Sequence, residues 1–363
     1  MSRPLRIGLI PPFWTPIPPT TYGGIERIVY WLAEELVRRG HEVTLFGTGD
    51  SRTSGRLVVV CEKNMLDYMA ETEAYVYEAY ANAAVARVIE RAGDCDVLHF
   101  HIGMHWMPFA ALAAARSLFT IHTFASYDDR WLARNFPGVG LAGISRYQAA
   151  QLEEGTGREV AVVYNGCDFT AFEPRLDECG LSRSRGTECS GGSYLAFLGR
   201  MSFDKNPLDA IRIARAAGMP IVLAGQAQQA KEEAYFEAEI KPLIDGDMVR
   251  YIGPVNHAQK QELLRNAAAL IFPIQWAEPF GLVMIEAMAC GTPVLARSLG
   301  SVAEVVEAGV TGYHAAEIEE MKALLPATLA LDRRTVRARA EARFSHMRMV
   351  DGYEELYRRL VGG

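Results

Sequence analysis

Two glutamates separated by seven residues, Glu278 and Glu286, are the side chains in this sequence whose spacing most clearly suggests chemistry. Pro279 and Gly281 mark a turn and the first positions of a helix. Residues 280–289 are almost entirely apolar and predict that helix, which Gly291 and Pro293 would end before a new strand. One carboxylate is therefore expected just before a helix and the other inside it.

The start of this helix is suited to bind an anion. Backbone N–H groups at a helix N-terminus lack intrahelical partners, so a phosphate can bind near Phe280, Gly281 and Leu282. The carboxylates on either side can each accept hydrogen bonds from hydroxyl groups. A nucleotide sugar presents its sugar, diphosphate and ribose in that order. The alternative is a core helix with two solvated acids, but Glu286 lies in an apolar segment where an unpaired carboxylate is costly.

A cationic loop precedes this segment in the sequence. Residues 199–206 read Gly-Arg-Met-Ser-Phe-Asp-Lys-Asn and follow an expected strand, so Arg200 and Lys205 would lie at the carboxyl end of a sheet. Expulsion of a nucleoside diphosphate develops negative charge, which preorganised cations stabilise. Arginine can bind a phosphate bidentately and lysine supplies a point charge. Two loop cations taken alone are more often simply solvated.

Two further elements of the first half could contribute to a site. Gly23 and Gly24 lie between the first strand and the first helix, where glycine allows close backbone approach to a ligand. The spacing differs from GxGxxG, so no nicotinamide cofactor is expected. His122 follows a strand, where a lone histidine is often structural. His99 and His101 share a strand face, yet with His105 they offer no convergent third ligand, so no metal site is expected.

Short apolar runs alternate with helical patterns through most of the chain, which predicts two successive α/β domains with parallel sheets. The predicted domains are residues 1–172 and 194–335, joined by a polar, aperiodic linker at 173–193, with C-terminal helices at 336–363. The strands are expected at 5–10, 42–46, 97–100, 117–122, 141–144, 160–163, 194–198, 221–224, 249–252, 269–272 and 293–296. The helices of the first domain are expected at 24–39, 74–92, 108–115 and 146–154.

These motifs together resemble retaining glycosyltransferases of family 4, over nearly the whole chain. The resemblance implies the GT-B fold, α/β with two facing Rossmann-like domains, parallel sheets and a deep interdomain cleft. It further implies an acceptor-side N-terminal domain, a donor-binding C-terminal domain, and a last helix that returns to the N-terminal domain. In the second half, the sequence is similar to the branch that includes oligosaccharide-antibiotic and other secondary-metabolite transferases.

The resemblance also implies roles for individual residues. Glu278 would approach hydroxyls of the transferred sugar, and Glu286 would hold the nucleotide ribose. The implied catalytic residues are Glu278, His122, Arg200 and Lys205. The implied substrate-binding residues are Gly23, Gly24, Arg200, Lys205, Gly253, Glu278, Phe280, Gly281, Leu282 and Glu286. The implied reaction transfers a hexose, expected to be glucose from UDP-glucose, to an acceptor hydroxyl with retention and without a metal or other cofactor.

Composition limits the other function classes. The chain has 363 residues, half of them hydrophobic, and a net charge of −7, which gives no reason to expect a nucleic-acid partner. No signal peptide or transmembrane segment is expected, and six cysteines without metal-type spacing fit a reducing cytoplasm. The expected partners are a nucleotide-sugar donor and a small-molecule or glycan acceptor. The oligomeric state stays open, a homo-oligomer included.

Two alternatives stay open at this point. A nucleotide-sugar epimerase or hydrolase could use the same fold. A non-catalytic sugar-nucleotide-binding protein could share it too, although the intact set of Arg200, Lys205, Glu278 and Glu286 argues against that class.

Overall fold

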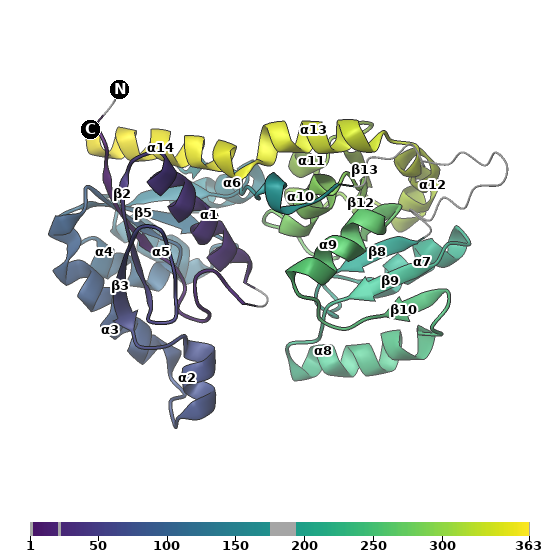
Figure 1. Cartoon of the computed structure of the whole chain (residues 1–363), viewed down its shortest axis with the longest axis horizontal. Helices are drawn as coiled ribbons and strands as arrows, with labels where there is room; N and C mark the ends of the chain where they lie inside the picture. Colours follow the sequence, from purple (N-terminus) through teal and green to yellow (C-terminus); the bar gives the residue numbers. More distant parts are fainter. Residues whose placement is uncertain (1–2, 21–22, 175–193, 363) are drawn as a thin grey trace. The chain divides into compact units, whose positions relative to one another are not determined.

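A computed structural model describes residues 3–20, 23–174 and 194–362 of the 363-residue chain. It divides into two compact units (Figure 1). The first contains Met1–Gly166 and His346–Gly363, and the second contains Cys167–Ser345. Each unit is built on one parallel sheet, so the predicted α/β fold class with two successive parallel-sheet domains is confirmed.

The first unit has a seven-stranded sheet in the order β3-β2-β1-β4-β5-β6-β7. All neighbouring strands are parallel, and apolar side chains fill the space between the sheet and its helices. The strands are β1 Arg6–Ile10, β2 Glu42–Thr48, β3 Arg56–Cys61, β4 Val97–Phe100, β5 Arg116–Ile121, β6 Gly140–Gly143 and β7 Ala161–Val162. The helices are α1 Gly24–Arg38, α2 Met65–Glu71, α3 Tyr77–Glu90, α4 Met107–Ala110, α5 Tyr127–Asn135, α6 Arg146–Thr156 and α14 His346–Gly362.

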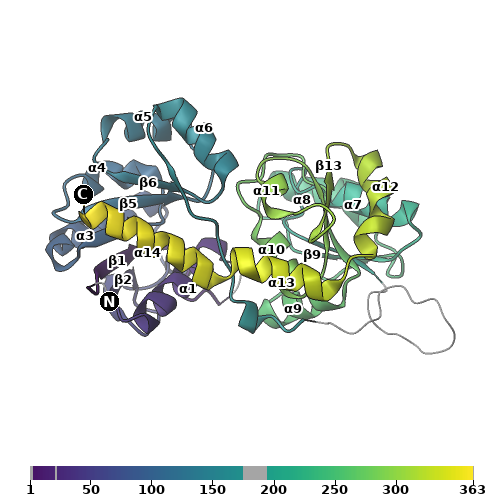
Figure 2. The same ribbon diagram turned by 90° about the horizontal axis from the view of Figure 1, so that it is seen from above.

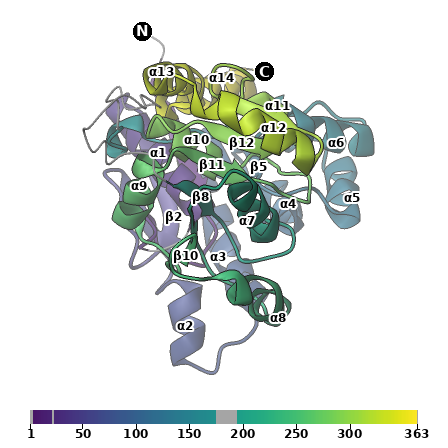
Figure 3. The same cartoon turned by 90° about the vertical axis from the view of Figure 1, so that its right-hand side faces the viewer.

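The second unit has a six-stranded parallel sheet in the order β10-β9-β8-β11-β12-β13 (Figure 3). Its strands are β8 Leu195–Leu198, β9 Ile221–Ala224, β10 Val249–Tyr251, β11 Ala269–Phe272, β12 Val294–Arg297 and β13 Gly312–Ala315. Its helices are α7 Pro207–Ala216, α8 Ala230–Tyr235, α9 His257–Asn266, α10 Leu282–Ala289, α11 Val302–Val305, α12 Ile318–Leu329 and α13 Arg333–Phe344. No described helix is long and apolar enough to cross a bilayer.

Both sheets contain a point where the strand order reverses. In the first unit, β1 pairs with both β2 and β4. In the second, β8 pairs with both β9 and β11. Loops that leave two such neighbouring strands diverge to opposite faces of the sheet, and the crevice between them is where ligands of open α/β sheets bind.

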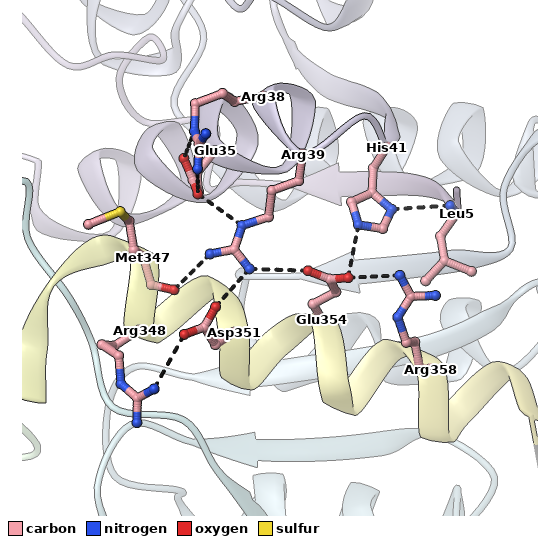
Figure 4. A network of polar contacts seen from close by, with 10 residues as sticks. All are labelled: Leu5, Glu35, Arg38, Arg39, His41, Met347, Arg348, Asp351, Glu354 and Arg358. Atoms are coloured by element: carbon pink, nitrogen blue, oxygen red, sulfur yellow. Dashed lines mark hydrogen bonds and ion pairs between the residues drawn. The ribbon is translucent and has the colours of Figure 1, made fainter. Parts of the chain in front are cut away.

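The last helix, α14, belongs to the first unit, where it packs on α1 and β4 (Figure 2). Tyr353 and Tyr357 are fully buried on its inner side. At its outer side Arg39 Nη1 lies 2.8 Å from Asp351 Oδ1 and 3.1 Å from Glu354 Oε2 (Figure 4). Glu354 also pairs with His41 and Arg358. Apolar packing and an ion-pair network therefore both fix the end of the chain to this unit.

The chain passes between the units at 166/167 and again at 345/346, rather than through the predicted linker at 173–193. Residues 167–172 belong to the second unit because Arg337 donates hydrogen bonds to the carbonyls of Phe169 and Phe172. Most of the predicted linker, residues 175–193, lies outside the described residues. The predicted C-terminal segment also divides, since α13 belongs to the second unit and α14 to the first.

Some elements differ from the prediction. The edge strands β3 and β13 were not predicted. β13 has the sequence Gly-Tyr-His-Ala, without a continuous apolar run, whereas β3 contains the apolar run 57–61 and could have been recognised as a strand. The helix expected at 108–115 is only Met107–Ala110, and that at 74–92 is Tyr77–Glu90.

Candidate active site

The cationic loop leaves β8 at the reversal point of the second sheet. Lys205 Nζ lies 2.6 Å from Glu278 Oε2, and Arg200 forms an ion pair with Glu232 of α8. Asn206 adopts a left-handed backbone conformation with φ 57°, which asparagine tolerates better than most residues. Its Nδ2 donates to the carbonyl of Pro273 in the loop after β11, at 3.0 Å. The two loops that leave β8 and β11 are thereby joined.

Glu278 lies in that second loop and is 7% exposed. Its Oε2 accepts from Lys205 and from Trp276 Nε1, at 2.6 and 2.9 Å. Its backbone is fixed too, since its carbonyl accepts from Ser301 N at 2.9 Å. The loop that contains Ser301 therefore supports Glu278 directly.

The helix after Glu278 begins at Leu282, two residues later than predicted. Gly281 precedes it with φ 80°, a left-handed conformation that glycine adopts without strain. A Cβ on Gly281 would lie 2.6 Å from Met284 Cε and 3.3 Å from Glu278 Cγ, so a larger residue would disturb the glutamate. Phe280 is 2% exposed and packs on Phe344, which leaves only its backbone available to a ligand.

Glu286, in α10, is 8% exposed and forms an ion pair with Lys260 of α9. The cost of an unpaired carboxylate in an apolar helix is thus avoided by a cation that sequence analysis did not identify. Lys260 lies in a helix with a capping box at Asn256, but its spacing to Glu286 in the chain gives no signal of the contact.

Gly253 follows β10 in a left-handed conformation with φ 72°. Its carbonyl accepts from Gly225 N at 2.8 Å. Gly225 in turn lies so close to Gly199 that a Cβ on it would be 1.9 Å from the Gly199 carbonyl oxygen. The carboxyl ends of β10, β9 and β8 therefore approach one another closely through glycine backbone.

Three predicted site residues belong to the first unit. Gly23 caps α1, and a Cβ there would lie 2.7 Å from Pro19 Cβ and 3.0 Å from Glu26 Oε2. Gly24 is the first residue of α1. His122 directly follows β5. The structure thus brings Arg200, Lys205, Gly253, Glu278, Phe280, Gly281, Leu282 and Glu286 into the second unit, and Gly23, Gly24 and His122 into the first.

A cavity of about 410 Å³ lies in the first unit, lined by residues 16–20, by Tyr30 and Glu34 of α1, and by Arg52 and its neighbours. The loop that lines this cavity also contains two aromatic residues, Phe13 and Trp14, whose rings could either stack on a ligand or support a rigid loop. Phe13 is fully buried, and Trp14 stacks on Tyr77 with ring centres 4.0 Å apart. Phe13 is therefore a core residue.

The histidines near the carboxyl end of β4 form hydrogen bonds rather than a metal site. His101 Nδ1 lies 2.9 Å from His122 Nε2, and His99 lies 2.6 Å from the Tyr357 hydroxyl and 2.7 Å from Thr120 Oγ1. Within residues 3–20, 23–174 and 194–362, no three histidine, cysteine, aspartate or glutamate side chains are grouped to hold a metal ion. Burial lowers the pKa of His122 to about 3 and holds those of His99 and His101 well below the usual value.

These depressed pKa values predict acid destabilisation. In the unfolded chain a histidine protonates below about pH 6.5, whereas in the folded protein these rings stay neutral, so stability is lost as pH falls below 6.5. Each buried histidine contributes up to about 1.4 kcal/mol per pH unit. Urea unfolding at pH 7.0 and 5.5 should show this loss, and His101→Gln should reduce it. Equal pH dependence in wild type and variant would contradict the assignment.

Sequence analysis missed three residues that contact the predicted ones: Trp276, Lys260 and Glu232. Trp276 is two residues before Glu278 and could have been noticed as an aromatic residue beside a predicted site carboxylate. Lys260 and Glu232 lie in polar helices where nothing in the local pattern distinguishes them. Only the three-dimensional packing of α8 and α9 reveals their contacts.

Two α/β units, each with a parallel sheet that contains a reversal point, are the architecture of GT-B glycosyltransferases, and comparison with known proteins agrees. The model "Glycosyl transferases group 1" matches residues 183–342, and the model "Glycosyltransferase Family 4" matches residues 22–170. Together they span most of the chain. This protein belongs to the family 4 glycosyltransferases.

Two relatives and one solved structure show which named proteins this chain is similar to. A glycogen synthase of Mycobacterium tuberculosis is 24% identical over 349 residues, which cover 82% of this chain and 80% of the relative. A phosphatidyl-myo-inositol mannosyltransferase of Mycolicibacterium smegmatis is 26% identical, with 85% and 80% covered. Among solved structures, the Anabaena protein HepE in complex with UDP and glucose has a TM-score of 0.70 at 19% identity, with 97% of this chain and 99% of that chain covered.

Proposed function

We propose that this protein is a retaining hexosyltransferase that transfers glucose from UDP-glucose to an acceptor hydroxyl. The observation that carries the proposal is the joined pair of loops after β8 and β11 at the reversal point of a parallel sheet, where Lys205 pairs with Glu278 and the same loop carries Arg200. The names of the two mycobacterial relatives support a hexose. The complex of the Anabaena protein with UDP and glucose supports UDP-glucose as the donor.

In this proposal the donor diphosphate binds to Arg200, Lys205 and the backbone before α10. Both cations already have carboxylate partners, Glu232 and Glu278. A lysine ammonium has three donors, so Lys205 can keep its bond to Glu278 while it binds a phosphate oxygen. An arginine likewise has five N–H donors. The two ion pairs therefore hold the cations in place before the anion arrives and reduce the cost of ordering them.

The two glutamates would bind opposite ends of the donor. Glu278 would accept hydrogen bonds from hydroxyls of the sugar, while Glu286, held by Lys260, would accept them from the ribose. The first unit, which contains Gly23, Gly24 and His122, would be the acceptor-side domain. The second unit would be the donor domain.

The proposed reaction balances without a dedicated base. The bond between the anomeric carbon and the phosphate oxygen breaks, and the acceptor oxygen bonds to that carbon on the same face. The acceptor proton passes to the departing phosphate oxygen. Arg200 and Lys205 stabilise the negative charge that develops on the diphosphate, which is the largest contribution that such a site can make.

A UDP-release assay tests the function. The purified protein should release UDP from UDP-glucose faster when the matching acceptor is present in a panel of sugars, sterols, phenols and glycans. Equal release with and without every acceptor would indicate a hydrolase. UDP-glucose binding without any release would indicate a binding protein, and neither binding nor release would reject the proposed donor.

Activity is expected to survive chelation. Arg200, Lys205 and the backbone before α10 provide the positive field that Mg²⁺ would otherwise supply. The chain has two Asp-x-Asp sequences, residues 94–96 and 245–247, but Asp96 pairs with Arg6 at 2.9 Å and Asp245 accepts from the backbone of Asp247 and Val249. Turnover should stay within about twofold in excess EDTA. Loss in EDTA with recovery in Mn²⁺ or Mg²⁺ would refute this expectation.

A further inference from the structure

Trp276 contacts both charged groups at the centre of the second unit's candidate site. Its Nε1 donates to Glu278 Oε2 at 2.9 Å, and Lys205 Nζ lies 2.6 Å from that same oxygen. The ammonium also lies 4.7 Å from the centre of the Trp276 ring. Each member of this Lys205–Glu278–Trp276 cluster therefore contacts the other two.

The backbone around the cluster is fixed by contacts from three loops. Gln275 N donates to Asp204 O at 2.8 Å, which ties the loop of Trp276 to the loop of Lys205. A Cβ on Gly300 would lie 2.3 Å from Glu278 N, so the third loop presses against the main chain of Glu278. With the main chain held, the side-chain torsions of Glu278 decide where its carboxylate points.

Lys205 alone does not set the direction in which the Glu278 carboxylate points. Its ammonium is a point charge on a flexible stem, so it can follow a carboxylate through several rotamers. The indole N–H, in contrast, is a single donor in the plane of a rigid ring. The face of the same ring attracts the ammonium and restricts its position. Trp276 therefore fixes both partners of the ion pair at once.

Both of these donors contact Oε2. The other carboxylate oxygen, Oε1, is the one that the cluster leaves to accept hydrogen bonds from a ligand. A carboxylate that can rotate would present either oxygen, at variable angles. A carboxylate that is held by the indole N–H presents Oε1 in a defined direction. Recognition of a particular sugar hydroxyl requires such a fixed direction.

We propose that Trp276 is a positioning residue that orients Glu278 toward the hexose and thereby determines how strongly the site binds the sugar part of the donor. The proposal rests on the proposed function, since it takes a nucleotide sugar as the ligand. Trp276→Phe removes the N–H that holds Glu278 but keeps an aromatic ring beside Lys205, so it affects the sugar and leaves binding of the bare nucleotide unchanged.

A ligand-free double-mutant cycle tests the contact itself. The free energy of unfolding in urea is measured for wild type, Trp276→Phe, Glu278→Ala and the double variant. Phenylalanine keeps an aromatic ring but lacks the N–H, so Trp276→Phe should cost at most about half as much when Glu278 is already alanine. An equal cost in both backgrounds would mean that the two residues are not coupled and would overturn the proposal, whether or not the protein binds UDP-glucose.

Calorimetric titration with UDP and with UDP-glucose tests whether Trp276 affects binding of the sugar part of the donor. Trp276→Phe should raise the ratio of Kd for UDP-glucose to Kd for UDP about tenfold over wild type, the expected loss for a hydrogen bond to a charged group. Trp131→Phe, a change at an exposed tryptophan of α5, is the matched control and should leave the ratio unchanged. An unchanged ratio in Trp276→Phe, or equal losses for both ligands, would make Trp276 merely structural and overturn the proposal. Wild type that binds neither ligand would instead reject the proposed donor, while the unfolding cycle still decides the role of Trp276.

Discussion

Arg200→Ala and Lys205→Ala are each expected to lower turnover of UDP-glucose by about 100- to 1,000-fold. Each change removes one group that stabilises the negative charge on the departing diphosphate, and loss of one such donor costs about 3–4 kcal/mol in the transition state. The two cations come from a single loop after β8 but hold different carboxylates, Glu232 and Glu278, so neither can substitute for the other. Steady-state UDP release at saturating acceptor measures the effect.

Controls must separate charge from folding, because both changes leave a buried carboxylate without its cation. Glu232→Gln removes the partner of Arg200 but keeps the guanidinium, so we expect a much smaller loss of turnover. Arg212→Ala removes an exposed arginine of α7 that pairs with Asp209, and it should leave turnover unchanged. If the Arg200 and Lys205 variants fold normally and keep wild-type turnover, the diphosphate does not bind there.

The fold class could be predicted because a parallel sheet covered on both faces requires strands that are apolar throughout. Central strands such as β8 and β11 are fully or largely buried, and their short apolar runs are evident in the sequence. The edge strand β3 is half-exposed, yet it also contains an apolar run, residues 57–61, that sequence analysis overlooked. The edge strands β7 and β10 were predicted, whereas β13, Gly-Tyr-His-Ala, has no apolar run that indicates a strand.

The point where the chain changes units was harder to predict. Polar composition suggested the segment 173–193, because linkers usually lack apolar periodicity. The actual crossing at 166/167 lies before two buried aromatics, Phe169 and Phe172, which the second unit holds through Arg337.

The site residues could be proposed from the sequence because their chemical types and local spacing are informative. Glycines, a helix start and adjacent cations each have a physical reason to lie at strand ends. Their partners could not be proposed, since Glu232, Lys260 and Trp276 meet the site through helix packing and loop contacts. Sequence reasoning recognised that Glu286 needs a compensating charge, but it could not say that Lys260 supplies it.

Substitution of Glu286 is expected to weaken binding of the nucleotide, whereas substitution of Glu278 is expected to lower transfer of the sugar. Glu286→Ala should weaken UDP binding at least about tenfold, because a carboxylate that accepts hydrogen bonds from ribose contributes about 1.5–3 kcal/mol per bond. Glu278→Ala should leave UDP affinity unchanged or slightly higher, since it frees Lys205 for the phosphates. It should nevertheless lower turnover about 100-fold, because the sugar loses its acceptor group. Calorimetry with UDP and the UDP-release assay measure the two quantities.

Binding of 2′-deoxy-UDP tests whether Glu286 contacts the ribose. If Glu286 accepts a hydrogen bond from the 2′-hydroxyl, wild type should bind UDP more tightly than 2′-deoxy-UDP, and Glu286→Ala should bind both alike. Glu262→Ala, at an exposed glutamate in α9 that pairs only loosely with Arg265 at 3.7 Å, is the matched control and should keep the wild-type preference. Glu278→Ala should keep it too, because its carboxylate is assigned to the sugar. Equal loss of UDP affinity in the Glu278 and Glu286 variants, or a preference for UDP that survives in Glu286→Ala, would show that the two carboxylates do not divide the donor between them.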